Sequence, residues 1–281
     1  LYGKSIGEEA RYREKDILLG PGVNIYRTPL NGRNFEYMGE DPYLSLRMVV
    51  PYIEEVQKNG VAACVKHFAL NNQEVDDRAL NEIYLPAFKA AVQEGGAWAV
   101  MGAYNKYKGE HCCHNRYLLN DILKRDWAFD GVVVSDWGGT HDTKQAAENG
   151  LDMEFGSWTD GLSWGASNAY DNYYLAARKP FGSLNSPEHL AAARRIAGEG
   201  MVLLKNEGGV LPIDLGRAKT IAVVGENAIK MMTVGGGSSS LKVRHEYTPL
   251  EGIRAAAAGK AEVIYERGYV GDVTGDYNGV K

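Results

Sequence analysis

Cysteine is scarce in this sequence, with three residues among 281. Cys64 stands alone, and Cys112 and Cys113 are adjacent. An odd, low count argues against a disulfide framework, and adjacent cysteines rarely bridge each other because the geometry is strained. His111 and His114 flank the adjacent pair, but this spacing matches no standard zinc pattern. We therefore expect neither a disulfide scaffold nor a metal site.

Long apolar runs and an excess of basic residues are also missing. No stretch approaches the length of a membrane span. The formal net charge is −5, so the sequence lacks the excess of basic residues that is typical of proteins that bind nucleic acid. We therefore expect neither a membrane nor a nucleic-acid partner. No signal peptide is visible, and the sequence starts at Leu1 without Met, so the compartment cannot be read from these residues.

Glycine and the polar aromatic residues are plentiful. The sequence has 34 Gly, which indicates many tight loops, together with 17 Tyr and 5 Trp. These aromatic residues suit stacking on sugar rings, although ordinary protein cores use them as well.

Short apolar runs alternate with helical patterns over the first 155 residues. Each run is hydrophobic throughout and ends in polar residues, which is typical of a parallel α/β sheet. About five strand–helix units fit, whereas a complete (β/α)8 barrel needs about 250 residues. The chain is therefore an incomplete barrel or begins partway through one. We expect strands at 16–22, 61–65, 98–105, 132–134 and 150–154, helices at 1–16, 42–59, 77–94, 118–124 and 141–149, and a long functional loop at 23–42.

A second α/β domain follows a boundary. Residues 156–186 have weak periodicity and much Gly, Ser, Asn and Tyr, so we interpret them as a linker. From 187 to 281 we expect a second domain, with helices at 187–204 and 249–258, strands at 220–228 and 261–265, and a flexible loop at 235–240. Residues 223–227 followed by 235–238 resemble a phosphate-binding loop, but they lack both G-x-G-x-x-G and G-K-[ST].

The chain is organised around residues 131–139, GVVVSDWGG. Three consecutive valines predict a buried strand, and the strand ends abruptly in Asp136. Ligands of α/β folds bind at the carboxyl ends of strands, so Asp136 is a candidate catalytic carboxylate. The alternative is that Asp136 only caps the helix that follows.

Several other predicted strand ends carry polar residues that a barrel would bring to the same edge. Lys66 and Arg33 would favour an ionised Asp136 through charge attraction. The structural alternatives are that Lys66 and His67 bond loop backbone, that Tyr104 is a core residue, and that Arg33 and Glu36 pair only with each other. The candidates are Arg33 and Glu36, Lys66 and His67, Tyr104, and Asp136 with Trp137.

Four motifs give this chain a family resemblance. Residues 32–42 (GRNFEYMGEDP), 66–72 (KHFALNN), 101–105 (MGAYN) and 134–137 (VSDW) resemble the motifs of glycoside hydrolase family 3, in that family's order and closest to its β-glucosidase branch. Residues 200–207 and 221–225 resemble the opening of the family's second domain, an α/β sandwich. The resemblance implies an α/β fold, in which residues 1–155 form the C-terminal part of a (β/α)8 TIM-like barrel and residues 187–281 begin the sandwich.

The resemblance also implies roles for individual residues. Asp136 matches the catalytic nucleophile of a retaining enzyme. Arg33, Lys66 and His67 match residues that hold the sugar hydroxyls. The remaining substrate-binding candidates are Tyr104 near the nucleophile, Trp137 against the sugar, Glu36 as a supporting acid, and Met101 at the head of the motif that carries Tyr104.

The implied activity is that of a retaining exo-β-glucosidase, which releases terminal β-D-glucosyl residues through a covalent glycosyl-aspartate. Its substrate would be a β-glucoside or a short β-linked oligosaccharide, with no metal and no cofactor. A β-xylosidase or other exo-β-glycosidase on the same scaffold, and a catalytically inactive sugar-binding relative, are the alternatives. The resemblance favours a periplasmic or secreted location and leaves a homo-oligomer open.

The chain also departs from the family pattern. In the branch that it resembles, the acid/base Glu comes from the second domain, and no residue in 186–281 matches it. The N-terminal part of the barrel has no counterpart here, and residues 72–78 are fewer than is usual in the family. We therefore expect this chain to be a portion of a larger protein, or to have segments removed.

Overall fold

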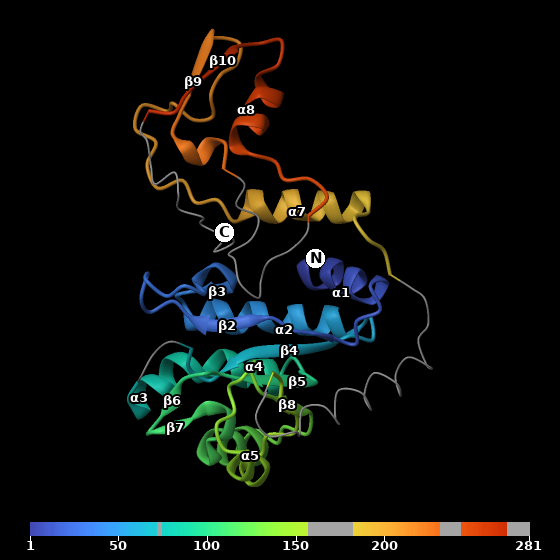
Figure 1. The fold of residues 1–281 in the computed structure, drawn as a ribbon. Coiled ribbons are helices and arrows are strands. Elements are labelled where there is room, and N and C mark those ends of the chain that lie inside the picture. The colour runs from blue at the N-terminus through green and yellow to red at the C-terminus, as the bar shows by residue number, and fades with distance from the viewer. Residues whose placement is uncertain (72–74, 157–181, 231–242, 269–281) are drawn as a thin grey trace. The chain divides into compact units, whose positions relative to one another are not determined.

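The computed structural model describes residues 1–71, 75–156, 182–230 and 243–268. The chain folds as two compact units, Leu1–Gly200 and Met201–Lys281 (Figure 1). No helix in the described ranges is both long and apolar enough to cross a membrane.

A parallel sheet forms the centre of the first unit. Its strands lie in the order β3-β2-β4-β5-β8, with β1 paired to β4, and Val134 at the end of β8 makes a further parallel bridge to Met153. This arrangement confirms the predicted partial α/β barrel. The strands are β1 (Ile17–Leu18), β2 (Gly22–Ile25), β3 (Tyr37–Gly39), β4 (Ala62–Phe68), β5 (Ala99–Gly102) and β8 (Val132–Val134).

Helices connect these strands close to the predicted positions. Asp41 begins α2 by accepting hydrogen bonds from the amides of Tyr43 and Leu44, and Pro42 follows it at the first helical position. The helical segments are α1 (Tyr2–Tyr12), α2 (Pro42–Gln57), α3 (Asp77–Ala79), the π-helical Leu80–Tyr84, α4 (Leu85–Gln93), the π-helical Tyr117–Asp126 and α5 (Thr143–Asn149). A short hairpin of β6 (Lys106–Tyr107) and β7 (Glu110–His111) follows β5.

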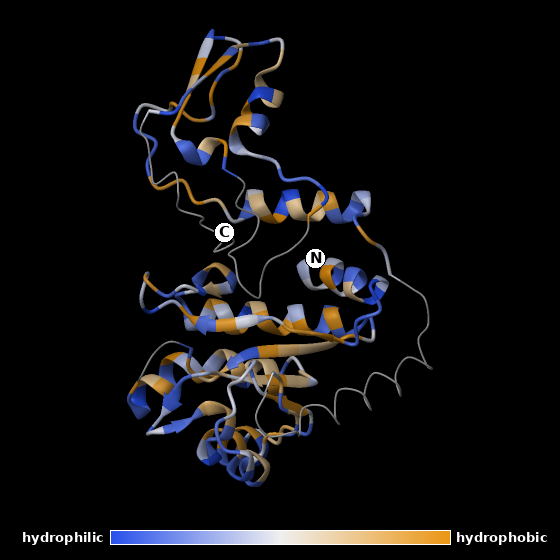
Figure 2. Ribbon diagram, viewed as in Figure 1, coloured by the Kyte–Doolittle hydropathy of each residue, from blue (hydrophilic) through white to orange (hydrophobic). Residues whose placement is uncertain are grey.

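The two faces of the sheet bury different side chains. Val65, Val100 and Val133 lie in the main core with the apolar residues of α2 and α4, whereas Cys64 and Met101 lie in a smaller cluster on the other face. Figure 2 shows β4 changing from apolar to polar along its length, because it ends in Lys-His-Phe. The core therefore fixes each strand, and polar residues follow where the apolar pattern stops.

The predicted loop at 23–42 is partly wrong, because it contains most of β2 and all of β3. Every residue of β2 is buried, including Asn24. The Asn24 side chain accepts a hydrogen bond from the His67 amide (2.7 Å) and donates to the His67 carbonyl (2.9 Å). Asparagine is normally depleted in strands, so local sequence favoured a loop, but here its amide supplies hydrogen bonds to the neighbouring strand.

Helix α7 (Pro187–Glu199) begins where predicted, with Ser186 as its cap, but it ends five residues before 204. Residues 201–204 are exposed and not helical, because Gly198 and Gly200 weaken the last turn. The structure groups α7 with the first unit, whereas the sequence placed it in the second domain. Most of the proposed linker at 156–186 lies outside the described residues.

His189 of α7 bonds two carboxylates of α1. Its Nε2 lies 2.7 Å from Glu8 Oε2, and its Nδ1 lies 3.0 Å from Glu9 Oε1. Two acceptors require two ring N–H groups, so this geometry selects the imidazolium. Burial lowers the pKa of His189, but the hydrogen bonds to Glu8 and Glu9 outweigh burial and raise it above its usual value.

We expect His189→Gln to destabilise the chain by about 1 kcal/mol in mildly acidic solution. Because the folded-state pKa is raised, the stabilisation is fully present below pH about 6.5 and is lost as the pH rises through the folded-state pKa. Urea unfolding of the variant and the parent from pH 5 to pH 9 measures the difference. Arg195→Gln, which removes an exposed ion pair with Glu199 on the same helix, is the control and should show no such pH dependence. A difference that is constant from pH 5 to pH 9 would contradict the charged pairing.

The second unit pairs β9 (Thr220–Val224) with β10 (Glu262–Glu266) in parallel. Helix α8 (Pro249–Ala257) connects them and begins with a reciprocal cap between Thr248 and Glu251. The strand predicted at 220–228 thus ends at 224 and continues as a 3-10 turn, Glu226–Ala228. Glu226 in this turn is paired with Arg267, and the predicted loop at 235–240 lies outside the described residues.

Candidate active site

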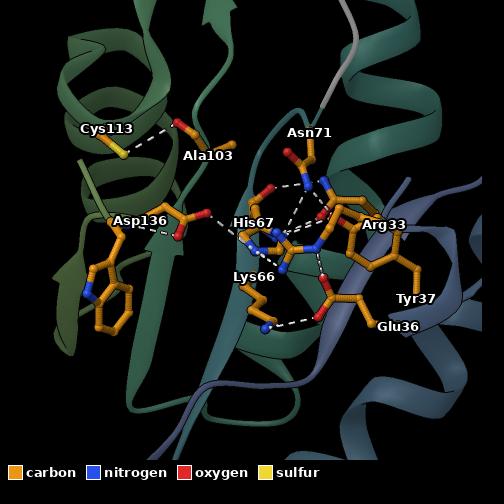
Figure 3. A network of polar contacts seen from close by, with 11 residues as sticks. Arg33, Glu36, Tyr37, Lys66, His67, Asn71, Ala103, Cys113 and Asp136 are labelled. Carbon is orange, nitrogen blue, oxygen red and sulfur yellow. Dashed lines mark hydrogen bonds and ion pairs between the residues drawn. The ribbon is translucent and has the colours of Figure 1, made fainter. Parts of the chain in front are cut away.

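Seven of the eight predicted site residues gather at the carboxyl ends of β4, β5 and β8, and two of the seven, Arg33 and Glu36, come from the segment between β2 and β3. Figure 3 shows side chains from three separate segments, including Arg33, Lys66 and Asp136, turned toward one another. We call this group the strand-end cluster. It consists of Arg33, Glu36, Lys66, His67, Tyr104, Asp136 and Trp137.

Glu36 holds the two cations of the cluster. Its carboxylate accepts a hydrogen bond from Arg33 Nε, and its other oxygen lies 3.1 Å from Lys66 Nζ. All three side chains are largely buried (Figure 3). Burial lowers the pKa of Arg33, but the hydrogen bond and charge of Glu36 outweigh burial and raise it. One carboxylate therefore fixes two cations whose remaining N–H groups can bind neutral hydroxyls.

His67 lies between this ion-paired group and Asp136. Its Nε2 is 3.4 Å from Arg33 Nη2 and 3.5 Å from Asp136 Oδ2. Burial, followed by the positive charges of Lys66 and Arg33, lowers the pKa of His67 to about 2. The contact with Asp136 is therefore made by a neutral imidazole and is not an ion pair.

Asp136 is 7% exposed and lies directly after β8. Its Oδ1 accepts a hydrogen bond from the Trp137 amide (2.9 Å), while Oδ2 is buried and has no hydrogen-bond partner among the described residues. The alternative that Asp136 caps the next helix is wrong, because Asp142 caps α5 through the Gln145 amide. Within the described residues, Oδ2 is therefore available to react with a ligand.

The pKa of Asp136 is shifted in the direction opposite to our expectation. Burial raises the pKa of Asp136, and this outweighs the Trp137 amide, the Tyr104 hydroxyl and the charges of Arg33 and Lys66, which lower it. Arg33 and Lys66 therefore lower the pKa of Asp136, as predicted, but the larger effect of burial raises it overall. Desolvation penalises the charged form of a buried carboxylate even beside positive charges.

Tyr104 follows β5 and is 39% exposed. Burial, then the charge of Asp136 and a hydrogen bond to it, raise the pKa of Tyr104 to about 12. The phenol therefore stays protonated and donates to the Asp136 carboxylate.

Trp137 forms an exposed aromatic surface next to Asp136. The residue is 54% exposed, and its ring contacts Phe155, with the ring centroids 4.9 Å apart. Position 156, on the covered side of the Trp137 ring, requires glycine, because a Cβ there would lie 2.5 Å from Trp137 Cδ1. Sequence reasoning missed Phe155, although it follows the predicted strand at 150–154 and therefore lies at the same edge as Asp136.

Met101, the eighth candidate, is 2% exposed and packs in a small apolar group with Cys64 and Val134. Its part in substrate binding stays a prediction. Sequence reasoning also missed Tyr37 and Asn71, which contact His67 on the side away from Asp136 (Figure 3).

The cysteine and histidine side chains of residues 111–114 pack against neighbouring parts of the protein. Cys112 and Cys113 are buried free thiols, and burial raises the pKa of Cys112 to about 11 and that of Cys113 to about 12. His111 stacks on His141 with ring centroids 3.8 Å apart. No group of three acidic, histidine or cysteine side chains is placed to hold a metal ion within the described part of the chain.

A cavity of about 660 Å³ lies elsewhere in the first unit. Its lining includes Trp98, just before β5, and Gly131, just before β8. It is therefore at the amino-terminal ends of the strands, and the strand-end cluster follows their carboxyl ends.

A partial parallel α/β barrel with a buried carboxylate, fixed cations and an exposed tryptophan at its strand ends defines a barrel domain of the carbohydrate-active type. Residues 2–154 match the N-terminal domain model of glycosyl hydrolase family 3, and residues 201–272 match the C-terminal domain model of that family. The chain belongs to glycosyl hydrolase family 3.

Curated relatives align with almost the whole chain. β-Glucosidase BoGH3A of Bacteroides ovatus is 53% identical over 95% of this chain, and thermostable β-glucosidase B of Acetivibrio thermocellus is 40% identical over 95%. The chain spans about two fifths of the length of these relatives, 42% and 39% respectively.

Solved structures share the fold. DesR, a β-glucosidase from Streptomyces venezuelae in complex with D-glucose, superposes with a TM-score of 0.84 at 34% identity, covering 94% of this chain and 40% of that protein. β-Glucosidase 3B from Thermotoga neapolitana, in complex with α-D-glucose, gives a TM-score of 0.82 at 32% identity, covering 94% of this chain and 41% of that protein.

Proposed function

We propose that this chain supplies the nucleophile and the sugar-binding side chains of a retaining exo-β-glucosidase that releases terminal β-D-glucosyl residues. The observation that carries the proposal is Asp136 Oδ2, a buried carboxylate oxygen that has no hydrogen-bond partner among the described residues and lies beside His67 and near the charges of Arg33 and Lys66. The names of the relatives, all β-glucosidases, and the glucose in two structural neighbours support the choice of substrate.

In the first chemical step, the Asp136 carboxylate forms a bond to the anomeric carbon as the bond to the leaving oxygen breaks. A second carboxylic acid protonates that oxygen from about 5–5.5 Å away. In the second step, water replaces Asp136 at the anomeric carbon, and the second carboxylate removes a proton from the water. Following the family resemblance, we place the second acid in the larger protein, outside this chain.

The rest of the cluster binds the sugar. Arg33 and Lys66, oriented by Glu36, offer charge-assisted hydrogen bonds to hydroxyls, and His67 offers a neutral one. Trp137 offers an apolar face to the C–H groups of the ring. Only the ionised form of Asp136 can attack, so kcat/KM should fall below its raised pKa.

Hydrolysis of matched aryl β-D-glucoside and β-D-xyloside by the whole protein tests this proposal. We expect a higher kcat/KM for the glucoside, and the first sugar detected by NMR should be the β-anomer, because two displacements retain configuration. A preference for the xyloside would assign the β-xylosidase alternative. Glucose binding without hydrolysis of either substrate would assign an inactive sugar-binding relative.

A further inference from the structure

The two ring nitrogens of His67 face different environments. Nε2 faces the strand-end cluster, 3.5 Å from the acceptor Asp136 Oδ2 and 3.4 Å from the donor Arg33 Nη2. Nδ1 faces the protein interior, 3.0 Å from the Tyr37 hydroxyl and 3.4 Å from Asn71 Nδ2. A neutral imidazole carries one N–H, so the groups around Nδ1 decide which nitrogen donates toward the cluster.

The hydrogen bonds on the interior side run in one direction. Asn71 Nδ2 donates to the Tyr37 oxygen. The Tyr37 oxygen is thereby used as an acceptor, and its own proton points to His67 Nδ1. The amide nitrogen of Asn71 also faces Nδ1. Both neighbours of Nδ1 therefore donate, whereas Nε2 faces an acceptor, Asp136 Oδ2, as well as the donor Arg33 Nη2, so Nδ1 is the acceptor and the ring proton lies on Nε2.

The surrounding backbone is built to hold this arrangement. Tyr37 is 6% exposed, and Gly22 on the neighbouring strand leaves room for its ring, because a Cβ there would lie 2.8 Å from Tyr37 Cδ1. Asn24 fixes the backbone of His67 through both its amide and its carbonyl. Tyr37 and Asn71 therefore hold the imidazole, and Asn24 holds the backbone that carries it.

We propose that Tyr37 and Asn71 are positioning residues that keep His67 in the Nε2–H form, so that His67 donates a hydrogen bond to one hydroxyl of the bound sugar. This inference rests on the proposed function for its ligand, but the protonation of His67 is a property of the free protein. Burial keeps the phenol protonated by raising the pKa of Tyr37, which is consistent with a fixed donor to Nδ1.

Neutron diffraction from crystals of the whole protein reads this protonation state without any activity. We expect deuterium on His67 Nε2 and none on Nδ1 in the unmodified protein. Deuterium on Nδ1 would overturn the proposal, whether or not the protein hydrolyses glucosides.

The kinetic test uses Tyr37→Phe in the whole protein with an aryl β-glucoside and its four monodeoxy analogues. We expect the variant to lose about tenfold in kcat/KM on the parent glucoside. For the one analogue that lacks the hydroxyl bound by His67, the variant and the parent enzyme should be equal within about twofold. Removing the phenol also frees Nδ1 to accept a proton, so the acidic limb of the pH profile should move to higher pH.

Tyr26→Phe is the matched control. Tyr26 lies beside Tyr37 and donates to its backbone carbonyl (2.5 Å), but its hydroxyl is not bonded to His67. We expect its kcat/KM to stay within about twofold of the parent for every analogue. An equal loss by Tyr37→Phe across all five substrates would assign Tyr37 a structural role and overturn the proposal. Absence of glucoside hydrolysis by the parent enzyme would overturn the proposed function instead, and the neutron result would still decide the inference.

Discussion

Asp136→Asn should lower hydrolysis of an aryl β-glucoside by at least about 10⁴-fold, because no nucleophile remains to form the covalent intermediate. The amide has the shape of the carboxylate and can still accept the Trp137 amide hydrogen bond. Glucose affinity, measured by calorimetry, should therefore stay within about tenfold of that of the parent protein. The kcat measured at saturating substrate gives the loss of hydrolysis.

The same variant should be more stable than the parent at neutral pH. Burial raises the folded-state pKa of Asp136, so folding favours its neutral form. The stabilisation that comes from the neutral form of Asp136 is fully present below the unfolded-state pKa of about 3.9 and is lost as the pH rises through the folded-state pKa. The Tm of Asp136→Asn should therefore exceed that of the parent at pH 7, and the two should converge near pH 3.5.

Asp142→Asn separates this effect from any general effect of replacing aspartate. Asp142 lies six residues further on and caps α5 through the Gln145 amide (2.9 Å). Its replacement should leave turnover unchanged, since asparagine also caps helices well. Turnover by Asp136→Asn within tenfold of the parent would contradict the assignment of the nucleophile.

Glu36→Gln is expected to lower kcat/KM by about 10²-fold, mainly through KM. The carboxylate of Glu36 orients both Arg33 and Lys66, and without its charge two largely buried cations face each other uncompensated. Removing one partner of a buried ion pair is destabilising, and we expect a loss of about 2 kcal/mol because these side chains keep some contact with water. Urea unfolding and steady-state kinetics measure the two effects.

The pH profile of Glu36→Gln distinguishes an electrostatic role from a purely structural one. Without the anion, Arg33 and Lys66 attract the Asp136 carboxylate more strongly, so the acidic limb of kcat/KM should move to lower pH. Glu148→Gln, which removes an exposed pair with Lys144, should change stability by less than about 0.5 kcal/mol. An unchanged acidic limb would show that Glu36 only supports the loop.

The sequence predicted those parts of the fold that depend on local patterns. The three valines of β8 and the apolar run of β4 are continuous hydrophobic strands, and Asp41-Pro42 is a recognisable helix start. Because these strands are parallel, their polar ends meet, and the structure does bring Arg33, Lys66 and Asp136 together.

The features that were missed depend on partners distant in sequence. Asn24 is a poor strand former, and only its bonds to His67, 43 residues away, explain its place in β2. Tyr37 and Asn71 are 34 residues apart, and no spacing rule pairs them. The sign of the pKa shift of Asp136 depends on burial, which charge counting along the sequence does not measure.

The central claim is that Asp136 forms the covalent intermediate. Incubating the whole protein with a 2-deoxy-2-fluoro β-glucoside that carries a reactive leaving group slows the second step and allows the glycosyl-enzyme to accumulate. After proteolysis, mass spectrometry should find one fluoroglucosyl group on the peptide containing Asp136, attached to that side chain, and none in the Asp136→Asn protein. A label on another carboxylate, with Asp136 unmodified, would contradict the account.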